Sequence, residues 1–414
     1  MKYGLLIYKD TDNIGDDIQS YAASQFLPRV DYVLDRENMM DFVSQDGRQV
    51  KVIMNAWYIH DKYKFCFSPY IYPLFISMHL KNFPYEDGLI IGDSYITNET
   101  QNFLKKYSPV GARDLNTKKL LDKLEITNYF SGCLTLTIKK FTDVKKSNYI
   151  CAVNINNKEL EILKSKTSKK IISINQDVDK GSLSKFTWEE RKNKVIELLK
   201  LYQGAELVIT TKLHCALPCL ALETNVLVLY DKCFDDRMKT FKKYFNFIDR
   251  NKFADVDISK IKNTDLYLPI RNNLNKMATD FINKKVEVET YDNKTFQVAK
   301  KIYDEKISLL ENNLNEIKKK YVKECKKTYN TEKKLKLIID TLEKEKEIDY
   351  NNHKKIIEKF EKEKEIDYNN HKQAIEILEK DKVNLTNELN RVYNSKGWKI
   401  ISIFRKIKHG GSKK

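Results

Sequence analysis

The chain has 414 residues, enough for two or three domains that each bury a core. Charged residues make up 32% of it and the formal net charge is +17, so the folded surface should attract phosphates, acidic membranes or nucleic acid without choosing among them. The opening MKYGLLIYKD lacks the apolar core of a signal peptide, and the most apolar stretch, residues 66–80, is too short and interrupted to span a bilayer, which predicts a cytoplasmic protein.

Cysteine usage agrees with that compartment. There are seven cysteines, an odd number, and Cys215 and Cys219 have helical i, i+4 spacing beside leucines. We therefore expect buried thiols in a reducing compartment, with neither disulfides nor a zinc site. No other cluster of metal ligands is visible in the sequence, so no metal is expected.

The first 285 residues alternate short β-rich runs with helical patterns. Strands are predicted at residues 2–8, 31–34, 51–57, 89–91, 109–112 and 129–137, and a second series at 149–155, 170–175, 207–211 and 226–230. Such alternation predicts parallel sheets covered on both faces. The polar run KKFTDVKKSN, residues 139–148, separates the two series as a linker. The expected architecture is two doubly wound domains, residues 1–140 and 149–290, with a cleft between them.

The first strand leads into DNIGDDIQSYAASQFL, where polar residues precede an amphipathic helix. Asn13 and Gly15 suit a tight turn, and Asp16 can accept hydrogen bonds from a sugar hydroxyl. The alternative is that the acid only caps the helix.

A second junction, PVGARDLNTKKLLDKL, ends a predicted strand at Gly111-Ala112-Arg113 and opens a helix near Asp114 or Asn116. An arginine there can grip a carboxylate or phosphate with two donors at once. The alternative is a structural pair between Arg113 and Asp114.

A third junction, VITTKLHCALPCLALETNVLVLY, places Lys212 and His214 between a β-branched run and a helix. Ligands of open parallel sheets bind at the carboxyl ends of strands, where helix N-termini point free N–H groups outward. Leu213, Ala216, Leu217, Leu220 and Ala221 follow at helical spacing as a buried stripe. The arrangement suits a phosphate, and the alternative is a surface lysine with a hydrogen-bonded core histidine.

From residue 301 the composition changes to that of a long solvated helix. EKEKEIDYNNHK begins at Glu343 and again at Glu361, 18 residues later, which is five turns at about 3.6 residues per turn. The repeat predicts a nearly straight rod over residues 301–393, with His353 and His371 solvated. Its apolar face is thin, so we expect it to pair as a coiled coil and make the protein a homo-oligomer of open number.

The last segment, residues 394–414, is basic and amphipathic. NSKGWKIISIFRKIKHGGSKK contains no acid, and Trp398 and Phe404 are the bulkiest members of its apolar stripe. Such a segment can lie on an anionic membrane surface. The alternative is that the stripe packs on a partner helix.

Taken in order, these junctions resemble the polysaccharide pyruvyl transferase family. The resemblance covers roughly residues 1–235 and is carried by Asn13-Ile14-Gly15-Asp16, Gly111-Ala112-Arg113-Asp114, Ser131-Gly132-Cys133-Leu134-Thr135 and Lys212-Leu213-His214. Lysine replaces the family's usual arginine at 212, which keeps the charge but loses the two-pronged grip. Ile91-Gly92-Asp93-Ser94 stands where many relatives have a glycine-rich or G-S-D stretch. The tail is similar to the C-terminal ends of bacterial polysaccharide glycosyltransferases.

The resemblance implies two Rossmann-like domains in a GT-B-like arrangement, with the donor site in the second. It also implies transfer of pyruvate from phosphoenolpyruvate to two hydroxyls of a sugar as a cyclic ketal, with no cofactor besides the donor substrate. The acceptor would be a surface polysaccharide or its lipid-linked precursor, met at the inner face of the membrane.

The implied site residues are those of the matching motifs. Arg113 and Lys212 are expected to hold the anionic groups of the donor, with His214 as proton donor or phosphate ligand and Asp16 orienting the acceptor. Asn13, Gly15 and Gly132 are expected to line the substrate site.

Three rival functions are weighed against this one. A GT-B-type glycosyltransferase would share the fold and the tail but use a nucleotide sugar, although no nucleotide-binding fingerprint follows Tyr8. A scaffold protein would use the coil alone, which the intact junctions argue against. A nucleic-acid binder is suggested only by charge, and part of that charge lies in the tail, so no nucleic-acid partner is expected.

Overall fold

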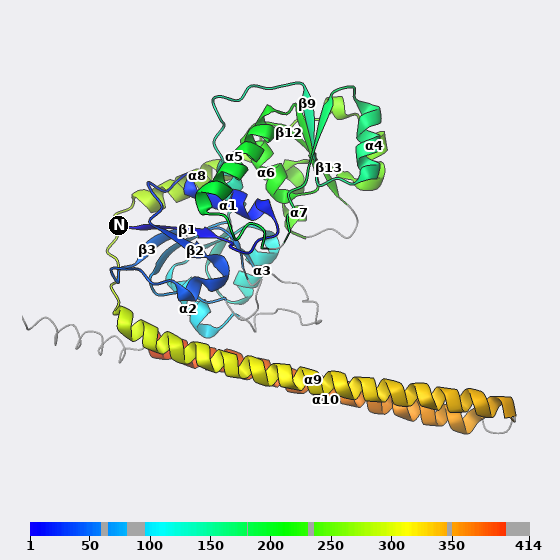
Figure 1. The fold of residues 1–414 in the computed structure, drawn as a ribbon. Helices are drawn as coiled ribbons and strands as arrows, with labels where there is room; N and C mark the ends of the chain where they lie inside the picture. Colours follow the sequence, from blue (N-terminus) through cyan, green and yellow to red (C-terminus); the bar gives the residue numbers. More distant parts are fainter. Residues whose placement is uncertain (59–64, 81–95, 180, 231–235, 346–349, 395–414) are drawn as a thin grey trace, which may run out of the picture. The chain divides into compact units, whose positions relative to one another are not determined.

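A computed structural model describes residues 1–58, 65–80, 96–179, 181–230, 236–345 and 350–394. Residues 1–291 form one compact unit, and the chain from residue 292 forms a second. The first unit is an α/β fold built on parallel sheets, whereas the described part of the second is helical (Figure 1).

The first sheet has the strand order β2-β1-β3-β5, and every neighbouring pair is parallel. Its strands are β1 (Tyr3–Ile7), β2 (Tyr32–Asp35), β3 (Val50–Met54) and β5 (Ile71–Phe75). Two short parallel pairs, β4 (Trp57–Tyr58) with β6 (His79–Leu80) and β7 (Val110–Ala112) with β8 (Asn128–Phe130), extend the arrangement, and a parallel bridge from Met78 to Ala112 connects them. Its helices are α1 (Ile14–Ser24), η1 (Arg36–Asp41), α2 (Asn98–Lys106) and α3 (Leu115–Lys123).

Two predictions for this sheet need correction or fall outside the described residues. The strand expected at residues 129–137 ends at Phe130, and Leu134–Thr137 instead forms the 3-10 helix η3. The cause is Gly132, whose φ of +71° turns the chain out of the extended conformation. Strand β5 was not predicted because it lies inside the long apolar stretch. The strand predicted at residues 89–91, with Ile91-Gly92-Asp93-Ser94, lies outside the described residues.

The second sheet has the order β10-β9-β11-β12-β13 and is also fully parallel. Its strands are β9 (Tyr149–Val153), β10 (Lys170–Ile174), β11 (Leu207–Thr210), β12 (Asn225–Tyr230) and β13 (Asn246–Asp249). Its helices are α4 (Asn157–Lys166), α5 (Trp188–Gly204), α6 (Leu213–Ala221), α7 (Asp236–Phe241), η4 (Lys242–Tyr244), η5 (Arg250–Asp255), η6 (Ile258–Lys260) and α8 (Leu268–Asn283). The four strands predicted here are confirmed, and β13 was missed.

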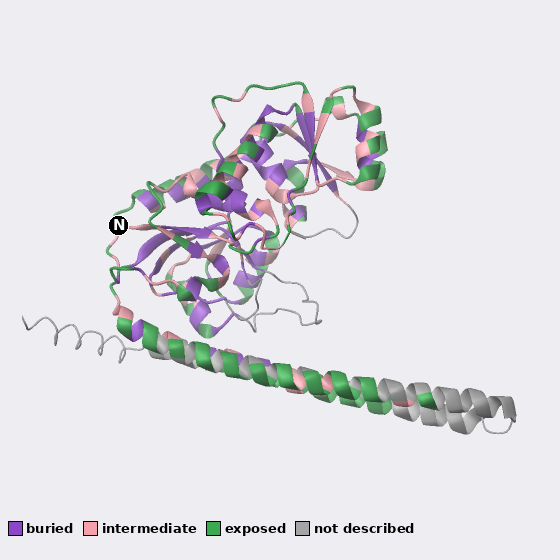
Figure 2. Cartoon of the chain, viewed as in Figure 1, coloured by how far each residue is buried: buried purple, intermediate pink, exposed green. Residues whose placement is uncertain are grey.

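The main core lies where the two sheets meet through helices. Buried apolar residues of α1, η3, α5, α6 and α8 form one cluster, and the strands appear as purple bands in Figure 2. The predicted stripe of α6 is buried, with Ala216, Leu217, Leu220 and Ala221 fully inaccessible. Cys66, Cys133, Cys151, Cys215 and Cys219 are buried free thiols, as expected.

After the second sheet, the chain returns to the first one through α8. The Lys51 side chain, on β3, is 1% exposed, and its Nζ donates to the carbonyl oxygens of Phe281, Ile282 and Lys284 at 2.6, 3.0 and 2.6 Å. These oxygens lie at the end of α8, where no helical N–H remains to satisfy them. The buried Lys51 therefore links the C-terminal end of α8 to β3 of the first sheet.

Replacing Lys51 with Met should lower the free energy of unfolding by about 3 kcal/mol, because buried carbonyls at the end of α8 lose their donor. Chemical denaturation followed by circular dichroism measures the change. Lys105→Met, an exposed lysine, is the control and should stay within about 0.5 kcal/mol of the wild type. Equal stabilities for the two variants would contradict the capping role.

In the described part of the second unit, two long helices, α9 (Asn293–Glu345) and α10 (Tyr350–Asn394), pack side by side (Figure 1). The rings of Tyr321, 24 residues before the end of α9, and His371, 21 residues after the start of α10, are 5.3 Å apart, so the helices are antiparallel. The sequence led us to expect one rod over residues 301–393. A helix with so thin an apolar face needs a partner, and here it finds one in the same chain.

The remaining predictions for this region are not decided by the fold. The basic segment predicted to bind membranes falls on residues 395–414, outside the described residues. Among the helices that the structure describes, none has the length and apolar character required to cross a bilayer.

Candidate functional site

Loops from the two sheets meet beside the N-terminus of α1. The amide of Ile14 donates to the carbonyl oxygen of Gln176 at 3.0 Å, the amide of Val178 donates to that of Asp12 at 2.8 Å, and Asn13 forms an antiparallel bridge with Asp177. The strand order reverses between β1 and β3 in the first sheet and between β9 and β11 in the second, and ligands of open parallel sheets bind at such points. Residues 12–14 follow β1, and residues 176–178 follow β10, the strand next to β9. The candidate site therefore lies where both sheets present their carboxyl ends.

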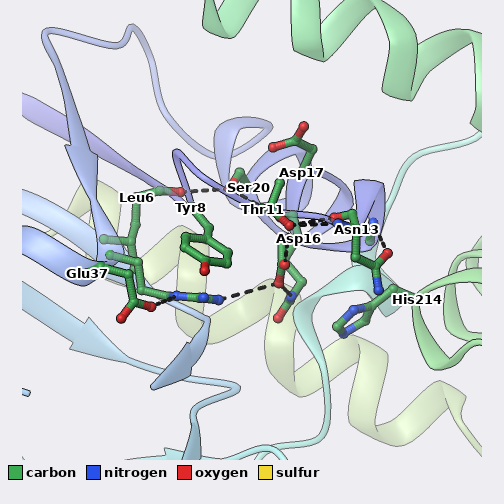
Figure 3. A network of polar contacts seen from close by, with 12 residues as sticks. Leu6, Tyr8, Thr11, Asn13, Asp16, Asp17, Ser20, Glu37 and His214 are labelled. Carbon is green, nitrogen blue, oxygen red and sulfur yellow. Dashed lines mark hydrogen bonds and ion pairs between the residues drawn. The ribbon is translucent and has the colours of Figure 1, made fainter. Parts of the chain in front are cut away.

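Asn13 and Gly15 build the entrance to α1. The Oδ1 of Asn13 accepts a hydrogen bond from the Gly15 amide at 2.8 Å, so Asn13 caps the helix. A Cβ on Gly15 would lie 3.1 Å from the Cβ of His214 and 2.9 Å from that Oδ1. The glycine is thus required because the histidine packs directly on the helix start, as Figure 3 shows for Asn13 and His214.

Gly15→Ala should lower turnover about 10- to 100-fold, because the added methyl group displaces His214, while stability changes little since alanine favours a helix. The check is to compare steady-state rates with thermal melting curves. Ser24→Ala, in the last turn of the same helix, serves as the control and should keep wild-type turnover. Wild-type turnover in Gly15→Ala would mean that the position of His214 does not matter.

Asp16 is fully occupied by hydrogen bonds within the chain (Figure 3). Its Oδ2 accepts from the Thr11 hydroxyl at 2.7 Å, and its Oδ1 accepts from Gln19 Nε2 at 3.0 Å and lies 3.4 Å from Arg36 Nη1. The helix cap is Asn13, so the capping alternative for Asp16 is wrong. Asp16 instead fixes the amide of Gln19, whose Oε1 accepts from Arg113.

Arg113 is the most unusual member of the site. It is 1% exposed, its Nη1 donates to Gln19 Oε1 at 2.8 Å and lies 3.5 Å from His214 Nε2, while its Nε and Nη2 have no hydrogen-bond partner among the described residues. The expected alternative, a pair with Asp114, is not formed, because Asp114 pairs with His79. Burial lowers the pKa of Arg113, yet a guanidinium stays charged in proteins. The site thus holds a buried cation with two unused donors.

His214 opens α6 with non-helical backbone angles. Pro218, four residues on, has no N–H to give to the His214 carbonyl, which instead lies 3.4 Å from Gln176 Nε2. Burial lowers the pKa of His214 well below its usual value, and the charges of Arg113, Arg237 and His79 lower it further. The imidazole is therefore neutral at pH 7, and an anion bound beside it would favour its protonation.

Lys212 and Gly132 lie apart from this group. The Nζ of Lys212 pairs with Asp177 Oδ1 at 2.6 Å, near the bridge to Asn13. A Cβ on Gly132 would lie 2.7 Å from Ile270 and 3.9 Å from Phe241, both apolar. The structure thus brings Arg113, His214, Asp16, Asn13 and Gly15 together, whereas Lys212 faces an acid and Gly132 faces the core.

A family model of polysaccharide pyruvyl transferases matches residues 13–232. The chain belongs to the polysaccharide pyruvyl transferase family. No curated protein matches it. The matched region begins at Asn13 and contains every contact of Arg113 and His214 described above. In the part of the chain that the structure describes, no group of three or more His, Cys, Asp or Glu is placed to hold a metal ion.

The candidate site has further members that the sequence did not reveal. His79 Nδ1 lies 2.5 Å from Asp114 Oδ2, Trp57 packs edge-on against His79 at 5.4 Å, and the Arg237 guanidinium lies 4.4 Å from the centre of the Trp57 ring. His79 was hidden in the apolar stretch, and Asp114 was interpreted as a helix start. It is indeed the N-cap of α3, since its Oδ1 accepts from the Thr117 amide at 2.9 Å, and its second oxygen holds the histidine.

Proposed function

We propose that the chain transfers pyruvate from phosphoenolpyruvate to two hydroxyls of a sugar, forming a cyclic ketal on a surface polysaccharide or its lipid-linked precursor. The observation that carries the proposal is Arg113, a buried guanidinium with two unpartnered donors at the meeting point of two parallel sheets. Its fork matches a carboxylate or a phosphate, and phosphoenolpyruvate has both. The two sheets and their strand orders also support the GT-B-like arrangement of two Rossmann-like domains.

The chemistry explains why a buried cation is needed. Protonation of the methylene carbon of phosphoenolpyruvate creates an oxocarbenium-like centre, which a sugar hydroxyl attacks. Phosphate then leaves, and a second hydroxyl closes the ketal. Anionic groups must be held beside the reacting carbon throughout, and a preorganised cation in a dry site does this better than water.

The roles of the other residues follow from their contacts. His214 is neutral in the free site, so it first accepts a hydrogen bond from the arginine and can become a proton donor only after the anion has raised its pKa. Asp16 acts through Gln19 to position Arg113. Lys212 can bind the donor only by exchanging its partner Asp177 for the ligand.

The test compares ligands directly. Phosphoenolpyruvate should raise the melting temperature of the full chain, because a ligand that binds only the folded state stabilises it. The protein should then release phosphate when a pooled lipid-linked glycan extract is added, and the glycan should gain a pyruvate ketal detectable by mass spectrometry. Stabilisation by nucleotides or nucleotide sugars, with no response to phosphoenolpyruvate, would favour a GT-B-type glycosyltransferase and overturn the proposal.

We also propose that the enzyme works at the cytoplasmic face of the membrane, where lipid-linked acceptors are presented, and that the helix pair forms a homo-oligomer through apolar residues that stay exposed on it, such as Val322, Ile366 and Ile377. The cationic segment 394–414 supports the first point. Sedimentation with anionic vesicles, at low and high salt, tests it against Trp398→Ser/Phe404→Ser, and equal binding in all cases would refute it. Light scattering of the full chain tests the second point.

A further inference from the structure

His79 lies on β6 and Arg113 directly follows β7, two short strands that a parallel bridge joins. Met78 bridges Ala112, the Arg113 amide donates to the Met78 carbonyl at 2.7 Å, and Trp57 pairs with His79 in the β4–β6 ladder. Residues opposite one another in parallel strands point to the same face. Trp57, His79 and Arg113 therefore follow one another across one face of the sheet, beside the anion site.

The partner of His79 fixes where its proton lies. An ionised carboxylate can only accept hydrogen bonds, and Asp114 Oδ2 lies 2.5 Å from Nδ1. The pKa of Asp114 is about 2: burial raises it, but the contact with His79 and the charge of Arg113 more than reverse that effect. Nδ1 therefore carries the hydrogen, and the lone pair is on Nε2.

The free nitrogen of His79 is buried and unpartnered. The residue is 3% exposed, and Nε2 has no hydrogen-bond partner in the part of the chain that the structure describes. Burial lowers the pKa of His79 to about 4, with Asp114 opposing the shift and the charges of Arg113 and Arg237 adding to it. Leaving the lone pair of a buried, neutral imidazole without a donor is unfavourable, and the hydroxyl group of a ligand would supply that donor.

We propose that His79, oriented by Asp114, accepts the proton of the attacking sugar hydroxyl through Nε2. This inference rests on the proposed function and names the base for the same site. His214, whose Nε2 lies 3.5 Å from Arg113 Nη1, is then left to the phosphate and the methylene carbon of the donor.

The step balances in atoms and charge. The hydroxyl oxygen forms its bond to C2 of the protonated donor while its O–H bond breaks and the proton passes to Nε2. The resulting imidazolium is stabilised by the Asp114 carboxylate through Nδ1–H. The C2–O bond to phosphate then breaks, and His79 returns its proton to the departing phosphate. Over both attacks the sugar loses two protons: one replaces the proton given to the methylene carbon and the other leaves on phosphate.

Three variants test the assignment. His79→Gln removes the base, and Asp114→Asn keeps an oxygen for the Thr117 cap while turning an NH₂ group toward Nδ1, which moves the imidazole hydrogen to Nε2. Both should lower the rate of phosphate release with the pooled glycan extract at least about 100-fold. The KM for phosphoenolpyruvate and its stabilising effect on melting should stay within about threefold, because the anion site is intact. Asp122→Asn, a surface carboxylate of α3, should match the wild type.

A second measurement does not depend on turnover. In histidine-¹⁵N-labelled wild-type protein at pH 7, the histidine signal that disappears in His79→Gln should show a protonated Nδ1 and an unprotonated Nε2, and it should change tautomer in Asp114→Asn. Wild-type rates in His79→Gln, or an Nε2–H tautomer in the wild type, would overturn the assignment alone. A wild-type protein that neither binds phosphoenolpyruvate nor releases phosphate would overturn the proposed function, and this inference with it.

Discussion

Arg113→Met should make the protein more stable and at the same time unable to hold its donor. The guanidinium is 1% exposed, and two of its nitrogens have no partner, so it lowers the stability of the free protein. Methionine fills similar volume without the charge. We expect the free energy of unfolding to rise by about 1–2 kcal/mol, even though Gln19 loses its contact.

The same substitution should weaken the binding of phosphoenolpyruvate at least about 100-fold, because it removes two charge-assisted hydrogen bonds of about 1.5–3 kcal/mol each. Melting curves with and without the ligand measure both effects in one experiment. Phosphoenolpyruvate should raise the melting temperature of the wild type. The variant should melt above the ligand-free wild type, at the same temperature with and without the ligand. A destabilised variant that still responds to the ligand would show that Arg113 serves the fold and not the anion.

Breaking the pair of Asp17 and Arg191 should have the largest effect on stability. Both side chains are 1% exposed and bonded through two contacts of 2.9 and 2.6 Å, and the arginine also donates to the carbonyl oxygens of Tyr8 and Lys9. The pair joins α1 of the first sheet to α5 of the second. Removing either partner leaves an uncompensated buried charge, which costs about 3–5 kcal/mol.

The two single variants should differ in their response to pH. Burial raises the pKa of Asp17, so in Arg191→Met the carboxyl group can take up a proton in the folded state more readily than in the unfolded one. The stability deficit of Arg191→Met should thus shrink as the pH falls from 8 toward 5, whereas that of Asp17→Asn should not. Denaturant unfolding at several pH values checks this.

The double variant completes the test. Asp17→Asn/Arg191→Met should be less destabilised than the sum of the two singles, by at least about 1 kcal/mol, because the second change removes the charge that the first left unpaired. Additive effects would mean that the two side chains do not stabilise the fold as a pair. Arg191→Met is also the matched control for Arg113→Met: both remove a buried guanidinium, but only the one with satisfied donors should destabilise.

What the sequence predicted correctly was carried by local signals. The apolar runs at β1, β9, β11 and β12 and the helical stripe of α6 are short-range patterns, and the structure confirms them. The junctions after β1, β7 and β11 were recognised because polar residues interrupt those patterns. The family assignment followed from their order along the chain and is confirmed by the match over residues 13–232.

What the sequence could not predict depends on contacts between distant segments. His79 follows a buried strand in a stretch that reads as continuous core, and nothing nearby indicates that Asp114, 35 residues later, turns an oxygen toward it. In the sequence Gln19 is an ordinary helix residue, and only the structure shows that Arg113 donates a hydrogen bond to it. Arg191 sits among charged residues at the start of α5, where a solvated face is the usual interpretation, yet it meets Asp17 across the two sheets.

The antiparallel packing of α9 and α10 limits how insertions and deletions can change the length of the two helices. Tyr321 and His371 face one another at similar distances from the end of α9 and the start of α10. Removing the same number of residues from both helices therefore leaves the start of α9 and the end of α10 near one another, whereas removal from one helix alone shifts every contact along the pair. Natural length variation in this part of the chain should therefore come as paired insertions or deletions. Asn394 would then lie near the start of α9 in short and long versions alike.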